Sequence, residues 1–458
     1  MLGLIAAVTA LAASNAQFQS KPCADPAMAQ RARCGTVSVP EDRAHPGGRK
    51  IDLNIIVIPA ATRTDDPPLF DIDGGPGLAD TKNATFYLTD GRAYSATRDV
   101  VLVDQRGTGG SNPLDCPELD AGDAALEPMY PSGAVDACRK RLSKIADLTK
   151  YTTDEAVADL EAVRRALGYQ SVDLVALSYG TTVALRYLAE AGSHVRSAVL
   201  LAAAPPFATP PRHHARSAQA ALDRLFADCA ADKACSTAYP NLRDELGRAL
   251  DRLRTSGGVR PEVAMERLRT MLYSPAGARR VPSIIRRLAD GDETALRSAS
   301  SGLNYYEGMY LSVTCSESMP WFDQAQAAKE SRATSFGDYR IARQREACAH
   351  WPRARVGANF FAPIKSDVPV LFVSGERDPV TPASWARQAS RGFTNGRQLT
   401  MPWSAHIFDG LTGIDTCFDP LILRFFETAD ARSLDATCLE AMAPPPFVLP
   451  DAPGAVRH

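Results

Sequence analysis

Ser178 stands between a predicted strand, Val172 to Leu177, and a predicted helix, Thr181 to Ala191. This strand–turn–helix context is that of a nucleophile elbow, in which a sharp turn lifts a serine Oγ above a sheet. Ala176 occupies the place where the elbow usually has glycine, and its small side chain still allows strand and helix to pack closely. Because a serine before an aromatic residue and a glycine is common, the motif alone does not establish a nucleophile.

The candidate base is His406. In the architecture built around this elbow the nucleophile comes first along the chain, the acid second and the histidine last. Of the seven histidines, His406 and His458 follow the strand predicted near residue 370, and His458 ends a proline-rich tail. His406 lies just past the last predicted strand, where a loop histidine can reach a serine. A lone histidine is also compatible with a core or surface role, but the order along the chain favours the base.

The candidate acid is Asp378, which follows PVLFVSGER at the carboxyl end of a predicted buried strand. Active-site residues gather at these strand ends in open α/β sheets. Glu376 is the nearest competitor and otherwise reads as a solvated loop charge. Asp367 precedes the strand and Asp409 is too close in sequence to His406.

The three residues together predict acyl transfer. His406 would remove the proton of Ser178 as the serine attacks a carbonyl, and Asp378 would fix the imidazole tautomer. Water activated by the same histidine would then hydrolyse the acyl-enzyme. The histidines are scattered and have no HExxH spacing, so we expect neither a metal nor a cofactor.

The turn DGGPG at residues 73–77 is the candidate oxyanion hole. Glycine lets backbone N–H groups approach an oxyanion closely, and we assign Gly75 as one donor. The second would be the N–H of Tyr179, next to the nucleophile. The alternative is a tight turn without a chemical role. The segment DQRG at residues 104–107 is expected to organise the loops behind the site.

The elements that must position these residues alternate between strand and helix from residue 36 to residue 205. Such alternation predicts a mostly parallel central sheet with helices on both faces. After Pro205 the chain becomes rich in Ala and Arg and its pattern is helical, which indicates an inserted cap. We predict a core at residues 17–205 and 363–442, split by a helical cap at 206–362 and followed by a proline-rich tail at 443–458.

The composition excludes several classes of protein. The 458 residues carry 51 Lys+Arg and 53 Asp+Glu, for a formal net charge of −2. No basic surplus is present to neutralise a phosphate backbone, so we expect no nucleic-acid partner. Hydrophobic residues make up 45% of the chain, which is ordinary for a globular protein with a large core.

Residues 1–16 resemble a signal peptide, because an uncharged apolar run is followed by small residues suited to cleavage before Gln17. A buried N-terminal helix is the alternative. Export would place the protein outside the cytoplasm, secreted or periplasmic. No later segment reaches the ~18 apolar residues of a membrane span.

Ten cysteines fit an oxidising compartment. No CxxC pair is present, which argues against zinc knuckles and thioredoxin chemistry. Free buried cysteines are one alternative; sequential pairing is the simplest proposal, and each bridge would stabilise the fold by ~2–4 kcal/mol. The predicted pairs are Cys23/Cys34, Cys116/Cys138, Cys229/Cys235, Cys315/Cys348 and Cys417/Cys438.

Together these motifs resemble the proline iminopeptidase and tripeptidyl aminopeptidase branch of the α/β-hydrolases. Two positions depart from that branch: Asp73 stands where these enzymes often have histidine, and Ala176 replaces the elbow glycine. The resemblance rests on GGPG at 74–77, DQRGTGGS at 104–111, LSYGTT at 177–182, GERDPVTP at 375–382 and the histidine after the last strand.

The resemblance implies an α/β-hydrolase fold and a secreted serine exopeptidase that releases short N-terminal units from peptides with a free N-terminus. Such enzymes hold the substrate amine with an acidic residue of the cap, and Glu317 is the candidate here; it otherwise reads as a surface glutamate. Tyr305, Tyr306 and Tyr310 would line a side-chain pocket or pack in the core.

Two other functions remain open. The same three residues could hydrolyse esters or amides of small molecules, because one elbow serves many acyl substrates. A binding protein without turnover is the third possibility, but such proteins usually lose a member of the triad, and here all three residues are present.

Overall fold

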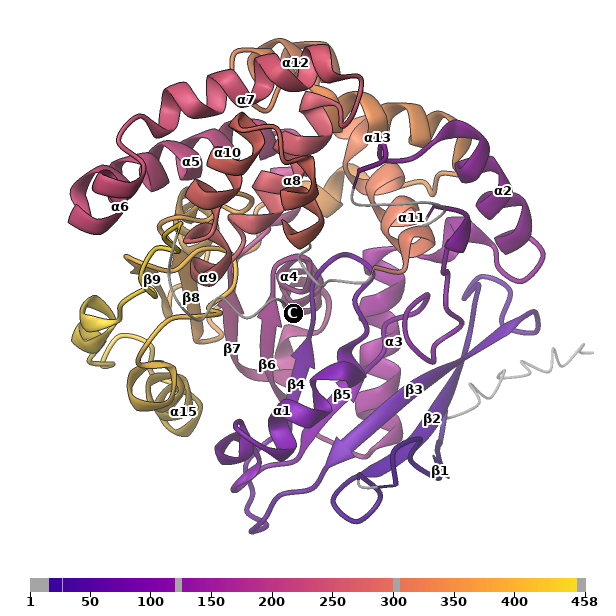
Figure 1. Cartoon of the computed structure of the whole chain (residues 1–458). Helices are drawn as coiled ribbons and strands as arrows, with labels where there is room; N and C mark the ends of the chain where they lie inside the picture. Colours follow the sequence, from indigo (N-terminus) through magenta and orange to yellow (C-terminus); the bar gives the residue numbers. More distant parts are fainter. Residues whose placement is uncertain (1–15, 27, 120–125, 300–304, 451–458) are drawn as a thin grey trace, which may run out of the picture.

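A central sheet of nine strands organises the computed structural model, which describes residues 16–26, 28–119, 126–299 and 305–450 (Figure 1). The strand order is β1-β2-β3-β5-β4-β6-β7-β8-β9. Pairing is antiparallel from β1 through β3 to β5 and parallel from β5 onward in that order, which confirms the mostly parallel sheet. The strands are β1 (Phe18–Lys21), β2 (Arg33–Pro40), β3 (Lys50–Ile58), β4 (Leu69–Ile72), β5 (Val100–Val103), β6 (Val172–Leu177), β7 (Val195–Leu201), β8 (Val370–Gly375) and β9 (Gly396–Met401).

Helices cover both faces of the sheet and form a further layer above it (Figure 1). We call α5 to α13 the helical layer. The helices are α1 (Ala84–Leu88), α2 (Ser132–Leu142), α3 (Thr153–Ala166), α4 (Tyr179–Ala191), α5 (His214–Ala231), α6 (Lys233–Ala238), α7 (Leu242–Ser256), α8 (Pro261–Met271), α9 (Pro275–Ala278), α10 (Val281–Ala289), α11 (Glu307–Glu317), α12 (Gln324–Arg332), α13 (Tyr339–His350), α14 (Ala383–Ser390) and α15 (Asp419–Thr428).

The central strands are buried on both faces because their apolar side chains alternate between two clusters. On β5, Val101 and Val103 pack with α3 and α4, whereas Val100 and Leu102 pack with α1 and α15. Successive side chains of a strand point to opposite faces, so a continuous apolar run indicates cover on both sides. The predicted helices on both faces are therefore confirmed.

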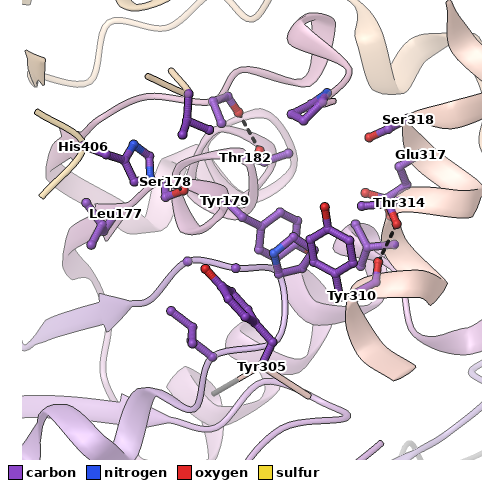
Figure 2. A pocket seen from close by; sticks show the side chains of 18 of the residues that line it. Leu177, Ser178, Tyr179, Thr182, Tyr305, Tyr310, Thr314, Glu317, Ser318 and His406 are labelled. Carbon is purple, nitrogen blue, oxygen red and sulfur yellow. Dashed lines mark hydrogen bonds between the residues drawn. The ribbon is translucent and has the colours of Figure 1, made fainter. Parts of the chain in front are cut away.

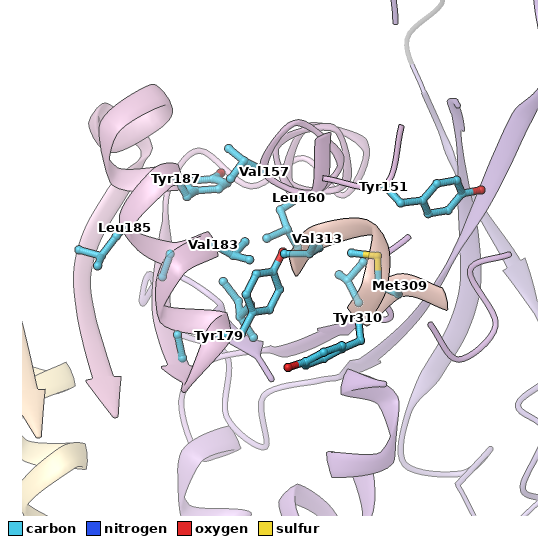
Figure 3. Close-up of a cluster of buried hydrophobic side chains, with 14 of the residues drawn as sticks. Tyr151, Val157, Leu160, Tyr179, Val183, Leu185, Tyr187, Met309, Tyr310 and Val313 are labelled. Atoms are coloured by element: carbon cyan, nitrogen blue, oxygen red, sulfur yellow. The ribbon is translucent and has the colours of Figure 1, made fainter. Parts of the chain in front are cut away.

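The helical layer has two parts with different partners. Helices α5, α7, α8 and α10 share an apolar cluster of their own. Helix α11 instead packs on the core: Met309 and Val313 belong to the same cluster as Val157 and Leu160 of α3 and Val183 of α4. Figure 3 shows these side chains together. Helix α11 thereby fixes its own side chains relative to the sheet.

All five predicted cysteine pairs are disulfides in the structure, and the described residues include no free cysteine, so the alternative of free buried cysteines is wrong there. Each bridge closes a short loop, so it lowers the conformational entropy of the unfolded chain without linking distant parts of the fold. The bridges are Cys23–Cys34, Cys116–Cys138, Cys229–Cys235, Cys315–Cys348 and Cys417–Cys438.

The bridges attach neighbouring elements of the sheet and of its helices to one another. Cys34 lies on β2 and holds the segment that follows β1, and Cys138 lies on α2 and holds the loop that follows β5. In the helical layer, Cys229–Cys235 joins α5 to α6 and Cys315–Cys348 joins α11 to α13. Cys417 lies just before α15, and its disulfide partner Cys438 lies after that helix.

The predicted signal peptide and tail lie at the two ends of the chain, and each extends beyond the residues that the structure describes. The predicted signal peptide, apart from Ala16, and the last residues of the predicted tail lie outside the described residues. Within the described residues, no helix has the length and hydropathy needed to cross a bilayer.

Candidate active site

The backbone at Ser178 has the strained geometry of a nucleophile elbow. Strand β6 ends at Leu177 and α4 begins directly at Tyr179, two residues before the predicted helix start. Ser178 has φ 55° and ψ −123°, in the positive-φ region that side chains rarely adopt. A Cβ at Gly180 would lie 2.1 Å from the carbonyl oxygen of Ile72, so only glycine fits there. The turn therefore holds Ser178 at the carboxyl end of β6.

Ser178, His406 and Asp378 form a continuous hydrogen-bonded chain. The Nε2 atom of His406 lies 2.9 Å from Ser178 Oγ, and its Nδ1 atom lies 2.9 Å from Asp378 Oδ2. His406 and Asp378 are 4% and 5% exposed, so water competes little for these bonds. The three residues come from loops after β6, β8 and β9, at the carboxyl ends of parallel strands.

Backbone donors hold the carboxylate of Asp378 in place. Its Oδ1 atom accepts from the N–H groups of Val380 and Thr381 at 2.7 and 2.8 Å, and Thr381 Oγ1 donates to Oδ2 at 2.6 Å. The competitor Glu376 points elsewhere and pairs with Arg224 of α5 at 2.8 Å. The geometry thus selects Asp378 as the partner of the imidazole.

Tyr273 covers the imidazole from the helical layer, which the sequence analysis did not foresee. Its ring meets the His406 ring edge-on, with centroids 5.0 Å apart and an interplanar angle of 75°. Its carbonyl oxygen accepts the N–H of Ile407 at 2.9 Å. Tyr273 follows α8 in an Arg-rich stretch. No motif or hydrophobic periodicity in this stretch predicts a contact with a histidine that is distant in sequence.

The glycine turn lies directly against Ser178. A Cβ at Gly74 would be 2.9 Å from Ser178 Cβ, so the two backbones approach closely. The N–H of Gly74 donates to its neighbour Asp73 at 2.6 Å. Gly75 adopts a φ of 113°, and both Gly75 and Tyr179 line the cavity in front of Ser178. The structure therefore brings both predicted oxyanion donors to the site.

Hydrogen bonds to the buried Asp80 and the half-buried Asp71 and Asp73 hold this turn and the strand before it. The N–H of Asp73 donates to Asp80 Oδ1 at 2.6 Å, and Asn83 Nδ2 donates to Asp71 Oδ2 at 3.0 Å. Burial and the nearby Asp73 raise the pKa of Asp71 to about 7, and burial also raises the pKa of Asp73 and, more strongly, of Asp80. The raised pKa values show that burial penalises the ionised form of all three carboxyls.

Asp104 and Arg106 bind neighbouring segments behind the site. Asp104 accepts from the N–H groups of Thr81 and Gly110, each at 2.9 Å. The fully buried Arg106 donates to Asp159 on α3 at 2.7 and 2.8 Å. This is the organising position that the sequence analysis expected.

A cavity of about 230 Å³ lies between the strand ends and the helical layer. Its lining is mostly apolar and aromatic, and includes Tyr305 and Tyr310. Figure 2 shows Ser178 and His406 together at one end, and Glu317 of α11 across the cavity from them. Tyr306 does not line it; its N–H donates to the carbonyl oxygen of Gly77 at 2.8 Å.

Glu317 is buried rather than a surface glutamate. It is 4% exposed, and its two carboxylate oxygens accept from the N–H and the hydroxyl of Thr153 at 2.7 and 2.5 Å. The Thr153 hydroxyl also contacts Tyr179 Oη at 2.9 Å. Burial raises the pKa of Glu317 to about 7. Thr153 is a further site residue that its position at the start of α3 did not reveal.

Relatives with similar sequences are hydrolases by name. A tripeptidyl aminopeptidase of Streptomyces coelicolor is 25% identical over 492 residues, covering 96% of this chain and 89% of the relative. A carboxylesterase B of Mycobacterium tuberculosis is 27% identical over 452 residues, covering 88% and 85%. The solved structure of a proline iminopeptidase of Mycobacterium smegmatis is 18% identical, with a TM-score of 0.46 and coverage of 86% of this chain and 98% of that one.

The family described as having the alpha/beta hydrolase fold matches residues 76–408. That stretch contains Ser178, Asp378 and His406 together with β5 to β9, and it spans well over half of the chain. The protein therefore belongs to the α/β-hydrolase family.

Proposed function

We propose that the protein is a serine hydrolase that works through an acyl-enzyme. The observation that carries the proposal is the pair of 2.9 Å contacts from His406 to Ser178 and to Asp378. His406 removes the Ser178 proton as Oγ attacks a carbonyl and then returns it to the leaving group, while Asp378 stabilises the imidazolium. Water activated by His406 releases the acyl group. The N–H groups of Gly75 and Tyr179 bind the oxyanion.

The proposed substrates are peptides with a free N-terminus, from which the protein releases short units. Glu317 supports this assignment because a carboxylate inside the cavity pairs with an ammonium group and sets where the chain is cut. The similarity to a tripeptidyl aminopeptidase also supports it. In this proposal the helical layer acts as the cap that encloses the substrate.

Small esters or amides are the second candidate substrates. The mostly apolar cavity and the similarity to a carboxylesterase favour them. Both candidates share the same triad, so the difference lies in whether a substrate amine is needed. A binding protein without turnover is disfavoured because all three triad groups are in hydrogen-bonding contact.

The deciding experiment compares tripeptidyl and prolyl p-nitroanilides with their N-acetylated forms. We expect acetylation to lower kcat/KM by roughly 10- to 100-fold, the value of a charge-assisted hydrogen bond. Glu317→Gln should remove most of this difference, whereas Glu376→Gln, a carboxylate paired with Arg224 away from the lining, should not. Equal cleavage of free and acetylated substrates would leave the esterase assignment standing. Ser178→Ala should fold normally and lose turnover.

The proposed location is outside the cytoplasm, secreted or periplasmic. Five disulfides support it, since such bridges persist in oxidising compartments. Fractionation of a tagged protein, with thiol alkylation to verify that the cysteines are oxidised, tests this. Reduced protein found in the cytoplasm would contradict it.

A further inference from the structure

The cavity has a second charged region, whose charged groups are arginines and so have the opposite sign to the Glu317 carboxylate. Arg340 of α13 lines the cavity, and Arg269 of α8 lies beside it. Both guanidinium groups donate to one carboxylate, Glu266: Arg269 through two bonds at 2.9 and 2.6 Å, and Arg340 through Nη1. The two arginines hold the pKa of Glu266 at about 2. Two cations share one anion here, so the region is positive.

Polar atoms in this region lack protein partners. Arg340 Nη2 donates to Tyr310 Oη at 2.8 Å, but its Nε is buried and has no acceptor among the described residues. His214, the first residue of α5, is 6% exposed and lines the same cavity. Neither of its ring nitrogens has a hydrogen-bond partner in the described part of the chain. Buried polar groups are rarely left in this state, which points to a ligand with acceptor atoms.

The positive region is connected to the catalytic histidine. Arg269 Nη1 donates to Tyr273 Oη at 2.9 Å, and the Tyr273 ring rests on His406. Burial lowers the pKa of His214 well below its ordinary value, and the nearby charges of Arg269 and Arg340 lower it further. A neutral imidazole still donates through one nitrogen. The cavity that Ser178 lines is thus also lined by one imidazole and one guanidinium that can donate hydrogen bonds.

We propose that His214 and Arg340 form a carboxylate-binding subsite that selects substrates carrying a negative charge. A carboxylate suits the site because it accepts several hydrogen bonds and balances the excess charge of the arginine pair. This inference rests on the proposed function, since it assumes turnover at Ser178. The carboxylate comes either from the free C-terminus of a short peptide or from an acidic side chain in the released unit.

Two matched substrate pairs distinguish these sources. The first is a short peptide as free acid and as C-terminal amide; the second is a peptidyl p-nitroanilide with Glu or Gln in the released unit. We expect wild type to prefer the charged member of one pair by roughly 10- to 100-fold in kcat/KM. Arg340→Gln should bring that ratio close to one, Arg340→Lys should keep part of it, and His214→Phe should lower it.

The control variant is Arg286→Gln, which removes a cation of the helical layer that pairs with Glu245 and does not line the cavity. It should leave the charge ratio unchanged. Ratios near one for both pairs in wild type, or a ratio that Arg340→Gln does not alter, would overturn the subsite. Because ratios on one enzyme are compared, partial loss of folded protein does not affect the result.

The same test separates the subsite from the aminopeptidase assignment. If acetylation of the amine has no effect while the charge ratio persists, the exopeptidase proposal fails and the subsite stands. If no peptide is cleaved, 4-acetoxybenzoate and 4-acetoxybenzamide provide a charged and a neutral ester for the same variants. Equal Arg340→Gln effects on these two esters would then refute the subsite.

Discussion

The Asp71 carboxyl leads to a prediction about stability and pH. It lies on β4 beneath the turn at 73–77, where burial raises its pKa from 3.8 to about 7. A carboxyl with a raised pKa in the folded state holds its proton there while the unfolded chain has already lost it. Between about pH 4 and pH 7 the folded state thus binds more protons, so stability falls as the pH rises.

Linkage gives the size of this effect. With pKa values of 3.8 in the unfolded chain and about 7 in the fold, Asp71 lowers stability by about 2 kcal/mol at pH 5 and by about 4 kcal/mol at pH 8. The difference of about 2–3 kcal/mol is an upper value, because the side chain is only half-buried. Asp71→Asn removes the charge, and its amide oxygen still accepts from Asn83.

Guanidinium unfolding at pH 5 and pH 8 measures the prediction. Relative to wild type, Asp71→Asn should gain up to about 2–3 kcal/mol of unfolding free energy more at pH 8 than at pH 5. Asp65→Asn, an exposed aspartate in the preceding loop, is the matched control and should show no such gain. Identical pH dependence in wild type and Asp71→Asn would mean that the carboxyl is ionised in the fold, and the argument from burial would be wrong.

Four further outcomes are expected. Asp378→Asn should lower kcat roughly 10³- to 10⁴-fold with an unchanged circular dichroism spectrum, because the imidazole tautomer is no longer fixed; near-normal turnover would contradict its role. Gly180→Ala should destabilise the fold by at least about 2 kcal/mol in denaturant unfolding, since its Cβ would lie 2.1 Å from a backbone oxygen. Replacing Cys315 and Cys348 by alanine should cost ~2–4 kcal/mol and lower both the amine and the carboxylate selectivity. Because Glu317 has a pKa of about 7, the rate ratio of free-amine to acetylated substrates should fall below about pH 7; a flat ratio would exclude an ionised Glu317.

The sequence could predict that the three proposed catalytic residues would meet, because their placement obeys local rules. Ser178 follows a six-residue strand that is apolar except for Asp173. Asp378 and His406 each follow a later strand in the order that the architecture requires. Parallel strands bring their carboxyl ends to one edge, so a residue placed after a strand is also placed in space. The local cysteine pairs, such as Cys23–Cys34 and Cys417–Cys438, were predictable for the same reason, since each partner is close along the chain.

The polar residues in and around the cavity could not be predicted in this way. Glu266, Arg269 and Arg340 belong to Arg-rich helices whose pattern resembles solvated surface. In the structure Arg269 is buried, and Glu266 and Arg340 are half-buried where they pair between α8 and α13. His214 begins a helix and Thr153 begins another, positions that normally indicate capping. Contacts between such helices depend on packing angles and loop lengths, which hydrophobic periodicity does not report.

Two of the groups proposed to select substrate, Glu317 and Arg340, are held by one pair of helices, α11 and α13. Glu317 follows Cys315 closely on α11, and Arg340 lies about two helical turns before Cys348 on α13. The disulfide and the bond from Arg340 to Tyr310 tie α11 to α13, and α11 packs on α3 and α4 beside the nucleophile. The triad itself depends on strand ends of the sheet. Changes in α11 should therefore alter the amine and the carboxylate selectivity together while the contacts among Ser178, His406 and Asp378 persist. The proposed chemistry and the proposed substrate choice thus depend on separate elements that meet at one cavity.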